Sequence, residues 1–367
     1  MENLSQEKIS QRFVRKRVLY FTKYSRLGAS SRMRSFQYFP YLAANGIDVT
    51  IRPLFGDNYL KGLYNGNSSL LLIVKAYLMR LLMLFTVFKY DKVVIEKELF
   101  PYLPAWAEWC LKIFSIKYIV DYDDAIFHNY DLNPRPLFRD LMGDKIDKVM
   151  RYSHEVIAGN SYLAARAVKA GAKNVNVVPT VIDLSRYALK EHTVHSPVVI
   201  GWIGTKSTFE KHFRSIKGLI TEVLEKYDVV FHVVGVTDDL GLGNNVKYFD
   251  WTEETEVGLI LNFDIGIMPL KDSEWEKGKC AYKLIQYMGC GLPVIASPVG
   301  MNNEVVIEGE NGFLASDEKD WLTAIEKYIT AINIRKEHGF AGRKLVTEKY
   351  CLEVTQDWLL KILQYDN

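Results

Sequence analysis

The sequence predicts an α/β protein with two doubly wound, Rossmann-like parallel-sheet domains. Its 367 residues exceed what one ordinary hydrophobic core accommodates. Short β-branched or aromatic runs alternate with helical segments, which is typical of parallel βαβ units. The polar stretch TVIDLSRYALKEHTVHSP interrupts this alternation, which then resumes. We therefore expect a linker near residues 183–197, a first domain over 1–190 and a second over 191–345.

The strands are expected where the β-branched and aromatic residues gather. In the first domain these runs are 17–22, 48–53, 92–96, 118–121, 155–158 and 176–178. In the second domain they are 198–203, 229–234, 246–249, 265–268, 293–296 and 312–314. Ligands of such sheets bind beyond the carboxyl ends of the strands. Functional residues are therefore expected directly after each run.

Composition and charge exclude several classes of protein. A formal net charge of +2 is too small for a surface that neutralises nucleic-acid phosphates. The four cysteines, at positions 110, 280, 290 and 351, have neither metal-ligand nor disulfide-framework spacing. The basic start MENLSQEKISQRFVRKR lacks the apolar core of a secretory signal. We expect reduced cysteines and a cytoplasmic protein.

The segment 69–88, SLLLIVKAYLMRLLMLFTVF, is apolar almost all round, but Lys75 and Arg80 argue against a membrane span. The favoured interpretation is a helix buried against a sheet. The alternative is a helix that touches the inner face of a bilayer carrying a lipid-linked acceptor.

The loop after the first strand has small residues, beginning with Gly28, ahead of a helix. Small residues allow close approach to the backbone, and a helix N-terminus favours anions. Arg32 and Arg34 follow in the first turns, where the helix dipole does not favour cations. They indicate either an anion or carboxylate partner, or a solvated surface. The pattern is not GxGxxG, so a dinucleotide site is not predicted.

The second domain begins in a similar way. Gly204, Thr205 and Lys206 follow the strand 198–203 and suit a phosphate-binding turn. Ser207 and Glu210 fit a capping box, which would be purely structural.

The most specific stretch is DIGIMPLKDSEWEKGKCAYKLIQYMGCGLPVIASPVG. Its loop carries Lys277 and Lys279, and a helix with Lys283 in its first turn follows. Gly291 is a candidate left-handed helix cap, and a further helix opens near Asn302. Two helix N-termini and up to three lysines are expected to face one crevice.

Three carboxylates, Asp121, Asp123 and Asp124, follow the fourth expected strand, with His128 nearby. They are compatible with an acceptor-binding wall, a structural turn or a metal site.

The following motifs occur in this order along the chain: GASSRMR, VIEKELFP, VDYDDAIF, VIAGNSYLAARA, VVPTVIDLSRY, DIGIMPL, KGKCAYKLIQYMGCGLPVIASPVG and NGFL. Together they resemble the family-4 retaining glycosyltransferases over nearly the whole chain. The resemblance implies the GT-B fold, two domains facing each other across a cleft. It also implies a last helix, within residues 346–367, that returns to the first domain with Trp358, Leu359 and Ile362 packed inward.

The resemblance implies roles for individual residues. The catalytic set is Lys283, Lys206, Asp124 and Glu304; the donor-binding set is Gly28, Arg32, Gly204, Thr205, Lys279, Gln286 and Asn302; the acceptor-side set is Glu98, Asp121 and His128. The family has two glutamates eight positions apart, where this chain has Gly278 and Gln286. Glu274 and Glu276 are the candidates for the missing carboxylate.

The implied function is transfer of a sugar, with retention, from a nucleotide-sugar donor to a glycan or lipid-linked acceptor. Cell-surface polysaccharide or lipopolysaccharide assembly is the family's commonest setting. Neither a metal nor another cofactor is expected, and peripheral membrane contact is possible. The alternatives are a nucleotide-sugar 2-epimerase of the same architecture and a catalytically degenerate sugar-nucleotide-binding protein.

Overall fold

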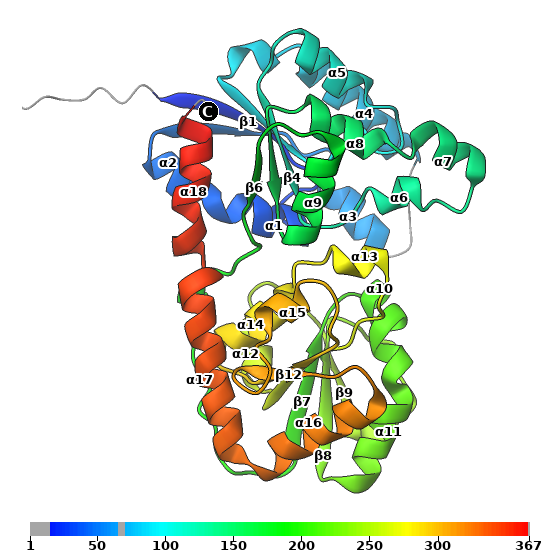
Figure 1. The fold of residues 1–367 in the computed structure, drawn as a ribbon, viewed down its shortest axis with the longest axis vertical. Helices are drawn as coiled ribbons and strands as arrows, with labels where there is room; N and C mark the ends of the chain where they lie inside the picture. Colours follow the sequence, from blue (N-terminus) through cyan, green and yellow to red (C-terminus); the bar gives the residue numbers. More distant parts are fainter. Residues whose placement is uncertain (1–14, 65–69, 366–367) are drawn as a thin grey trace, which may run out of the picture.

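The computed structural model describes residues 15–64 and 70–365, and their strands form two six-stranded parallel sheets (Figure 1). The strand orders are β2-β1-β3-β4-β5-β6 and β12-β11-β10-β7-β8-β9. Successive residues of β1 belong to different cores, because Val18 and Tyr20 pack on one face of the sheet and Leu19 and Phe21 on the other. Burial on both faces explains why the strands are nearly continuous hydrophobic runs.

The first domain contains β1 (Lys16–Phe21), α1 (Ala29–Arg34), α2 (Phe39–Ala44), β2 (Ile47–Ile51), α3 (Asp57–Tyr64), α4 (Leu70–Leu84), β3 (Lys92–Glu96), α5 (Trp106–Ile113), β4 (Tyr118–Tyr122), α6 (His128–Asp131), α7 (Pro136–Met142), α8 (Lys145–Tyr152), β5 (Glu155–Ala158), α9 (Ser161–Ala170) and β6 (Val175–Val177). The second contains β7 (Val198–Ile203), α10 (Lys206–Thr208), α11 (Lys217–Lys226), β8 (Val229–Val234), β9 (Val246–Phe249), α12 (Glu256–Leu261), β10 (Ile265–Met268), α13 (Glu274–Lys277), α14 (Tyr282–Gly289), β11 (Val294–Ala296), α15 (Asn302–Val305), β12 (Gly312–Leu314) and α16 (Glu318–Thr330).

The expected strands are all present, displaced by two residues at most. The largest displacement is in β2, which ends at Ile51 rather than at Pro53, although Arg52 N–H and Leu54 N–H still donate to Tyr20 O and Thr22 O. Gly291 has φ +73°, which confirms the expected left-handed cap after α14.

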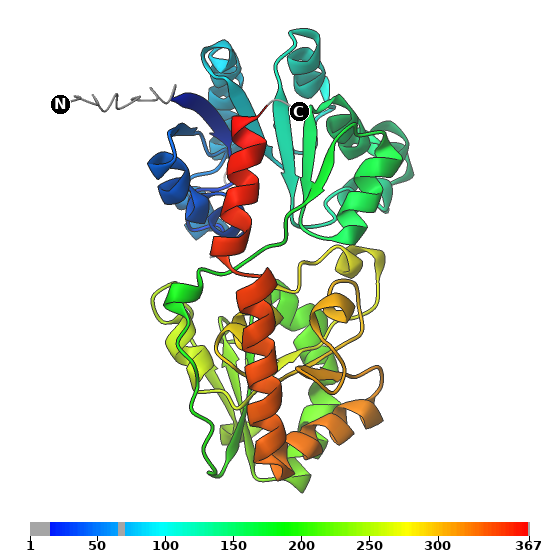
Figure 2. The ribbon, with the colours of Figure 1, turned by 60° about the vertical axis from the view of Figure 1, so that its left-hand side comes forward.

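Two long helices, α17 (Ile332–Lys349) and α18 (Leu352–Gln364), run one after the other along both domains (Figure 2). Leu359, Ile362 and Leu363 of α18 are buried in the core on one face of the first sheet. The return of the last helix is therefore confirmed. Trp358 was expected to pack inward, but it is 45% exposed because it lies at the margin of this contact.

The chain crosses between the domains twice, and the two crossings are bonded to each other. Ile182 N–H donates to Tyr350 O over 3.2 Å, and Leu352 N–H donates to Ile182 O over 2.9 Å.

The segment 69–88 was expected to be buried against the sheet. In the structure only one side of its helix, α4, is buried in this way. Arg80 points inward, where Nη2 donates to Thr22 O at 2.8 Å and to Arg52 O at 2.9 Å. Several leucines point outward. No helix among residues 15–64 and 70–365 has the length and apolarity needed to cross a bilayer.

Candidate functional site

The loop after β1 depends on a glycine. A Cβ atom at Gly28 would lie 2.5 Å from Tyr24 Cβ, so no larger residue fits there. Arg32 and Arg34 in α1 are both buried, which excludes the solvated-surface interpretation. Arg34 binds Asp121 with two hydrogen bonds, Nε to Oδ2 at 3.0 Å and Nη2 to Oδ1 at 2.5 Å. The carboxylate partner considered for these arginines is therefore found for Arg34, and Asp121 is committed to an internal pair rather than to the acceptor side.

Glu98 also points inward. Its carboxylate accepts a hydrogen bond from Tyr130 O–H at 2.7 Å and pairs with the buried Lys145 ammonium. Its neighbour Lys97 points toward the strand-end edge instead, because Lys97 has φ +67° and the chain turns sharply there. Sequence reasoning had missed Lys97, although its position between acidic residues was a usable signal.

Lys97 lies among the carboxylates that follow β4. Its Nζ is 2.8 Å from Asp123 Oδ1, 3.5 Å from Asp124 Oδ2 and 3.2 Å from Ser30 Oγ. Burial raises the pKa of Asp124, and the Lys97 ammonium opposes that rise. The ammonium group of Lys97 thus pairs with two of the carboxylates that were considered as a metal site. Among the described residues, no three His, Cys, Asp or Glu side chains are grouped to hold a metal ion.

The first loop of the second domain also requires a glycine. A Cβ at Gly204 would lie 2.5 Å from the Trp202 ring. The predicted capping box of Ser207 and Glu210 is wrong. Because α10 begins at Lys206, Thr205 is the N-cap and forms the box with Thr208.

The Lys206 side chain is 72% exposed and pairs with Asp238 at 2.9 Å. It therefore lies on the rim and is not brought together with the other predicted catalytic residues.

Lys283 lies half-buried in the first turn of α14, with Nζ 5.8 Å from the centre of the Trp202 ring. The pKa of Lys283 is lowered to about 7, mainly by burial and also by the nearby Lys279, while Asp124 of the first domain opposes the shift. Within the described part of the chain, neither Lys279 nor Lys283 forms an ion pair. Two basic groups and Asp124 thus meet where the two sheets' strand-end loops face each other.

Gly278 occupies the position of the family's first glutamate, and the fold explains the change. A Cβ there would lie 2.4 Å from Ala125 Cβ in the first domain. Asn160 Nδ2, also in the first domain, donates to Gly278 O at 3.0 Å. The loop before α14 is therefore pressed against the first domain, with no room for a longer side chain.

Gln286, at the second glutamate position, is buried, and its Nε2 donates to Tyr187 O–H at 3.1 Å. Tyr187 in turn donates to Glu256 Oε1 at 3.3 Å. Glu256, which was missed, is the carboxylate of this buried network. The earlier candidates lie elsewhere, since Glu276 pairs with Lys211 and Glu274 accepts from Tyr162.

Side chains from the two domains meet at both ends of this interface. At one end, Ser161 O–H donates to Glu304 Oε1 at 2.6 Å, and Tyr162 O–H donates to Glu274 Oε2 at 2.9 Å. His128 Nε2 lies 2.9 Å from the same Tyr162 hydroxyl. Asn302 is not exposed to this interface, because its Nδ2 donates to Ser297 O at 2.9 Å within its own turn.

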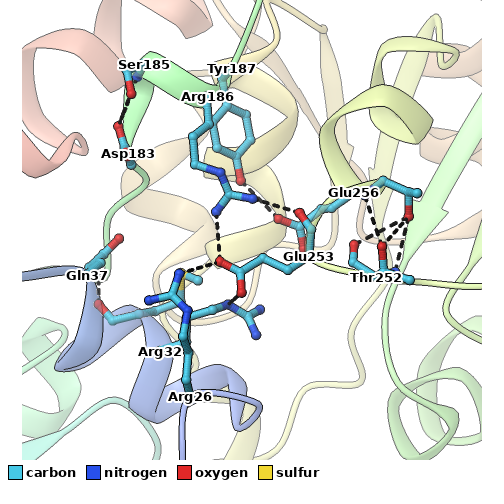
Figure 3. Close-up of polar contacts among 12 residues, drawn as sticks. Arg26, Arg32, Gln37, Asp183, Ser185, Arg186, Tyr187, Thr252, Glu253 and Glu256 are labelled. Carbon is cyan, nitrogen blue, oxygen red and sulfur yellow. Dashed lines mark hydrogen bonds and ion pairs between the residues drawn. The ribbon is translucent and has the colours of Figure 1, made fainter.

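At the other end, three arginines converge on Glu253, which lies between β9 and α12 (Figure 3). Arg26 Nη2 is 2.7 Å from Glu253 Oε1, and Arg186 Nη1 is 3.2 Å from the same oxygen. Arg32 Nε is 4.0 Å from Oε2, and its guanidinium lies 5.0 Å from the Trp251 ring centre. Arg32 thus reaches the second domain at Glu253, and its role in donor binding stays a prediction.

Residues 197–331, which contain all six strands of the second sheet, match the family model of the glycosyl transferases group 1. The second domain of the chain is therefore similar to this family. An uncharacterised glycosyltransferase of Methanocaldococcus jannaschii is 28% identical over 152 residues, which are 38% of this chain and 36% of that protein. The chain therefore spans about a third of the length of that relative.

Solved glycosyltransferase structures share the complete GT-B fold. A sucrose-phosphate synthase of Thermosynechococcus elongatus superposes with a TM-score of 0.72 at 15% identity, covering 95% of this chain and 98% of the other. HepE of Anabaena, solved in complex with UDP-glucose, gives a TM-score of 0.67 at 15% identity, covering 95% and 99%.

Proposed function

We propose that this group 1 glycosyltransferase transfers a sugar, with retention, from a nucleoside-diphosphate sugar to a glycan or lipid-linked acceptor. The observation that carries the proposal is the lysine pair at the start of α14. Lys279 and Lys283 are half-buried and form no ion pair with a carboxylate among the described residues. Burial, with the nearby Lys279, lowers the pKa of Lys283 to about 7. Buried charges normally have partners. A diphosphate would supply the negative charge that these lysines lack.

In the proposed reaction, the diphosphate of the donor binds at Lys279 and Lys283, and the acceptor enters from the side of Asp124. The acceptor attacks from the face that the diphosphate leaves, and the departing phosphate takes the acceptor's proton. The protein then has to orient two substrates and stabilise the charge that develops on the leaving group. The likeness to a fold seen with UDP-glucose supports the donor class.

We further propose that no metal ion or other cofactor takes part. The support is that Lys97 already neutralises Asp123 and Asp124, while lysines face the position proposed for the leaving group. The setting that we propose is cytoplasmic assembly of a cell-surface polysaccharide or lipopolysaccharide. Four free cysteines, of which three are buried, support a reducing compartment.

A panel of UDP-, GDP- and dTDP-sugars, tested by thermal shift, identifies the donor. A ligand at 100 times its Kd adds about 2.7 kcal/mol to stability. The bound donor is then incubated with and without acceptor, in EDTA and in Mg²⁺. We expect transfer that requires acceptor and is insensitive to EDTA. A new sugar nucleotide from donor alone would indicate an epimerase, and binding without any turnover would indicate a degenerate protein.

A further inference from the structure

The helix α4 has an unusual orientation of its side chains. Leu71, Leu78 and Leu82 are 77%, 56% and 56% exposed, and their spacing places them on one stripe of the helix. The buried charged residue is Arg80, on the opposite side. A surface helix of a globular protein normally shows the reverse arrangement, with apolar residues inward and charges outward.

The apolar stripe continues onto the neighbouring helix α5. Trp106 and Trp109 are exposed on α5, at positions three residues apart that share one side of the helix. The rings of Phe88, after α4, and Phe114, after α5, lie 5.9 Å apart and join the two surfaces. Figure 1 shows α4 and α5 together on the side of the first domain away from the second. We call the exposed apolar side chains of residues 70–88 and 106–114 the outer apolar face.

The exposed charges on the chain segment that carries the outer apolar face are mostly positive, and the exposed Asp144 beside Trp106 and Trp109 is paired with Lys148. Exposed lysines stand at positions 75, 89, 112 and 117, whereas the only exposed carboxylate among residues 70–117 is Asp91. The other acidic residues of this stretch, Glu96, Glu98 and Glu108, are buried. Exposed tryptophan, leucine and phenylalanine surrounded by lysine are the composition that binds the interface of an anionic bilayer. A second copy of the same face would meet this one with like charge, which opposes self-association.

We propose that the protein docks peripherally on anionic lipid bilayers through the outer apolar face. This inference goes beyond sugar transfer and does not depend on it, because binding to lipid is measured without donor or acceptor. Docking inserts the apolar side chains into the headgroup region and places the lysines beside lipid phosphates.

Flotation of the full chain with vesicles tests the proposal. We use phosphatidylcholine vesicles with and without about one third phosphatidylglycerol, which supplies the negative surface charge required. The variants are Phe85→Glu on the outer apolar face and Phe340→Glu on α17, which are matched because both phenylalanines are 74% exposed. We expect Phe85→Glu to weaken binding about tenfold or more, since it removes an inserted ring and adds a negative charge. Phe340→Glu should bind like the unaltered protein.

The charge is tested separately with Lys75→Glu and, as its match on α17, Lys344→Glu. The first should weaken binding to anionic vesicles by about tenfold and the second should not. Circular dichroism and thermal unfolding establish that each variant is folded. The proposal is overturned if the unaltered protein binds neither vesicle type, or if the face and control variants lose binding equally. It is also overturned if Phe85→Glu converts a dimer to a monomer in light scattering without changing vesicle binding.

Discussion

At the scale of the residue, Lys283 is the side chain whose environment most clearly requires a ligand. It lies near Trp202 and Lys279, and the opposing charge, Asp124, comes from the other domain. An ammonium held in this way is easily deprotonated, and a bound dianion would restore its usual pKa. The ammonium group of Lys283 would thus both bind the donor diphosphate and stabilise the charge that develops on it as it leaves.

Replacing Lys283 by alanine should lower kcat by about 10² to 10³, because one preorganised charge contact to the leaving group is lost. Steady-state kinetics with the donor identified by thermal shift measure this. The control is Lys226→Ala, which removes an exposed lysine of the same domain that pairs only with Glu222 of its own helix. A folded Lys283→Ala enzyme with turnover near that of the control would contradict the assignment.

Donor binding should take up protons above neutral pH. With a pKa of about 7, Lys283 in the free protein is largely neutral at pH 8, and the diphosphate restores its charge. The apparent affinity should therefore fall by up to about tenfold per pH unit above pH 7. Titration calorimetry at pH 8 in two buffers of different ionisation enthalpy should show uptake of up to about one proton. Lys283→Gln should abolish this uptake, and an unchanged uptake in that variant would exclude Lys283 as its source.

The orientation of individual polar residues could not be predicted from the sequence. Glu98 and Lys97 are neighbours, yet the first turns inward to Lys145 and the second turns to the strand-end edge. The partners that decide this, such as Arg34 for Asp121, are distant in sequence. Proximity to a strand end was sufficient to find the region but not to assign each side chain.

At the scale of the element, the central strands were predictable because they are buried on both faces and appear in the sequence as short β-branched runs. The loop before α14 was not predictable in this way. Its course against the first domain depends on Gly278 meeting Ala125 and on Gly159 meeting Cys280, contacts between residues more than a hundred positions apart. The side of α4 that faces solvent could not be predicted either, because a helix that is apolar all round does not indicate which of its sides packs against the sheet.

The helix α18 should stabilise the first domain although it is the last element of the described chain. Leu363 is fully buried against the first sheet, so Leu363→Ala should lower the free energy of unfolding by about 2–5 kcal/mol. Urea denaturation followed by circular dichroism measures the loss. Leu132→Ala, the same substitution at a side chain that is 56% exposed, is the control. Equal stability of the two variants would show that α18 does not contribute to this core.

At the scale of the whole molecule, the two domains touch at both ends of the interface that holds Lys283. Glu253 gathers three arginines at one end, and Glu304 and Glu274 accept from Ser161 and Tyr162 at the other. Each such contact is only partly buried and contributes little by itself. These partly exposed contacts flank a buried one, in which Asn160 Nδ2 of the first domain donates to Gly278 O of the second at 3.0 Å.

Glu253→Gln should loosen one end of the interface, because it removes the charge shared by Arg26, Arg32 and Arg186. We expect a larger radius of gyration in small-angle scattering and faster tryptic cleavage near residues 183–197. The thermal stability should change by only about 1–3 kcal/mol, since the three pairs are partly exposed. The control variant is Glu254→Gln, which makes the same substitution at the exposed residue next to Glu253. Identical scattering from the two variants would show that Glu253 does not hold the domains together.

The bonds that Ile182 makes to the chain on either side of Cys351 determine how such separation can occur. Two interdomain connections at separate places would each constrain the movement of the domains differently. Two connections that are hydrogen-bonded side by side act as one hinge. We therefore expect any rotation of one domain against the other to occur about this point, which would keep the facing strand-end loops in the same register.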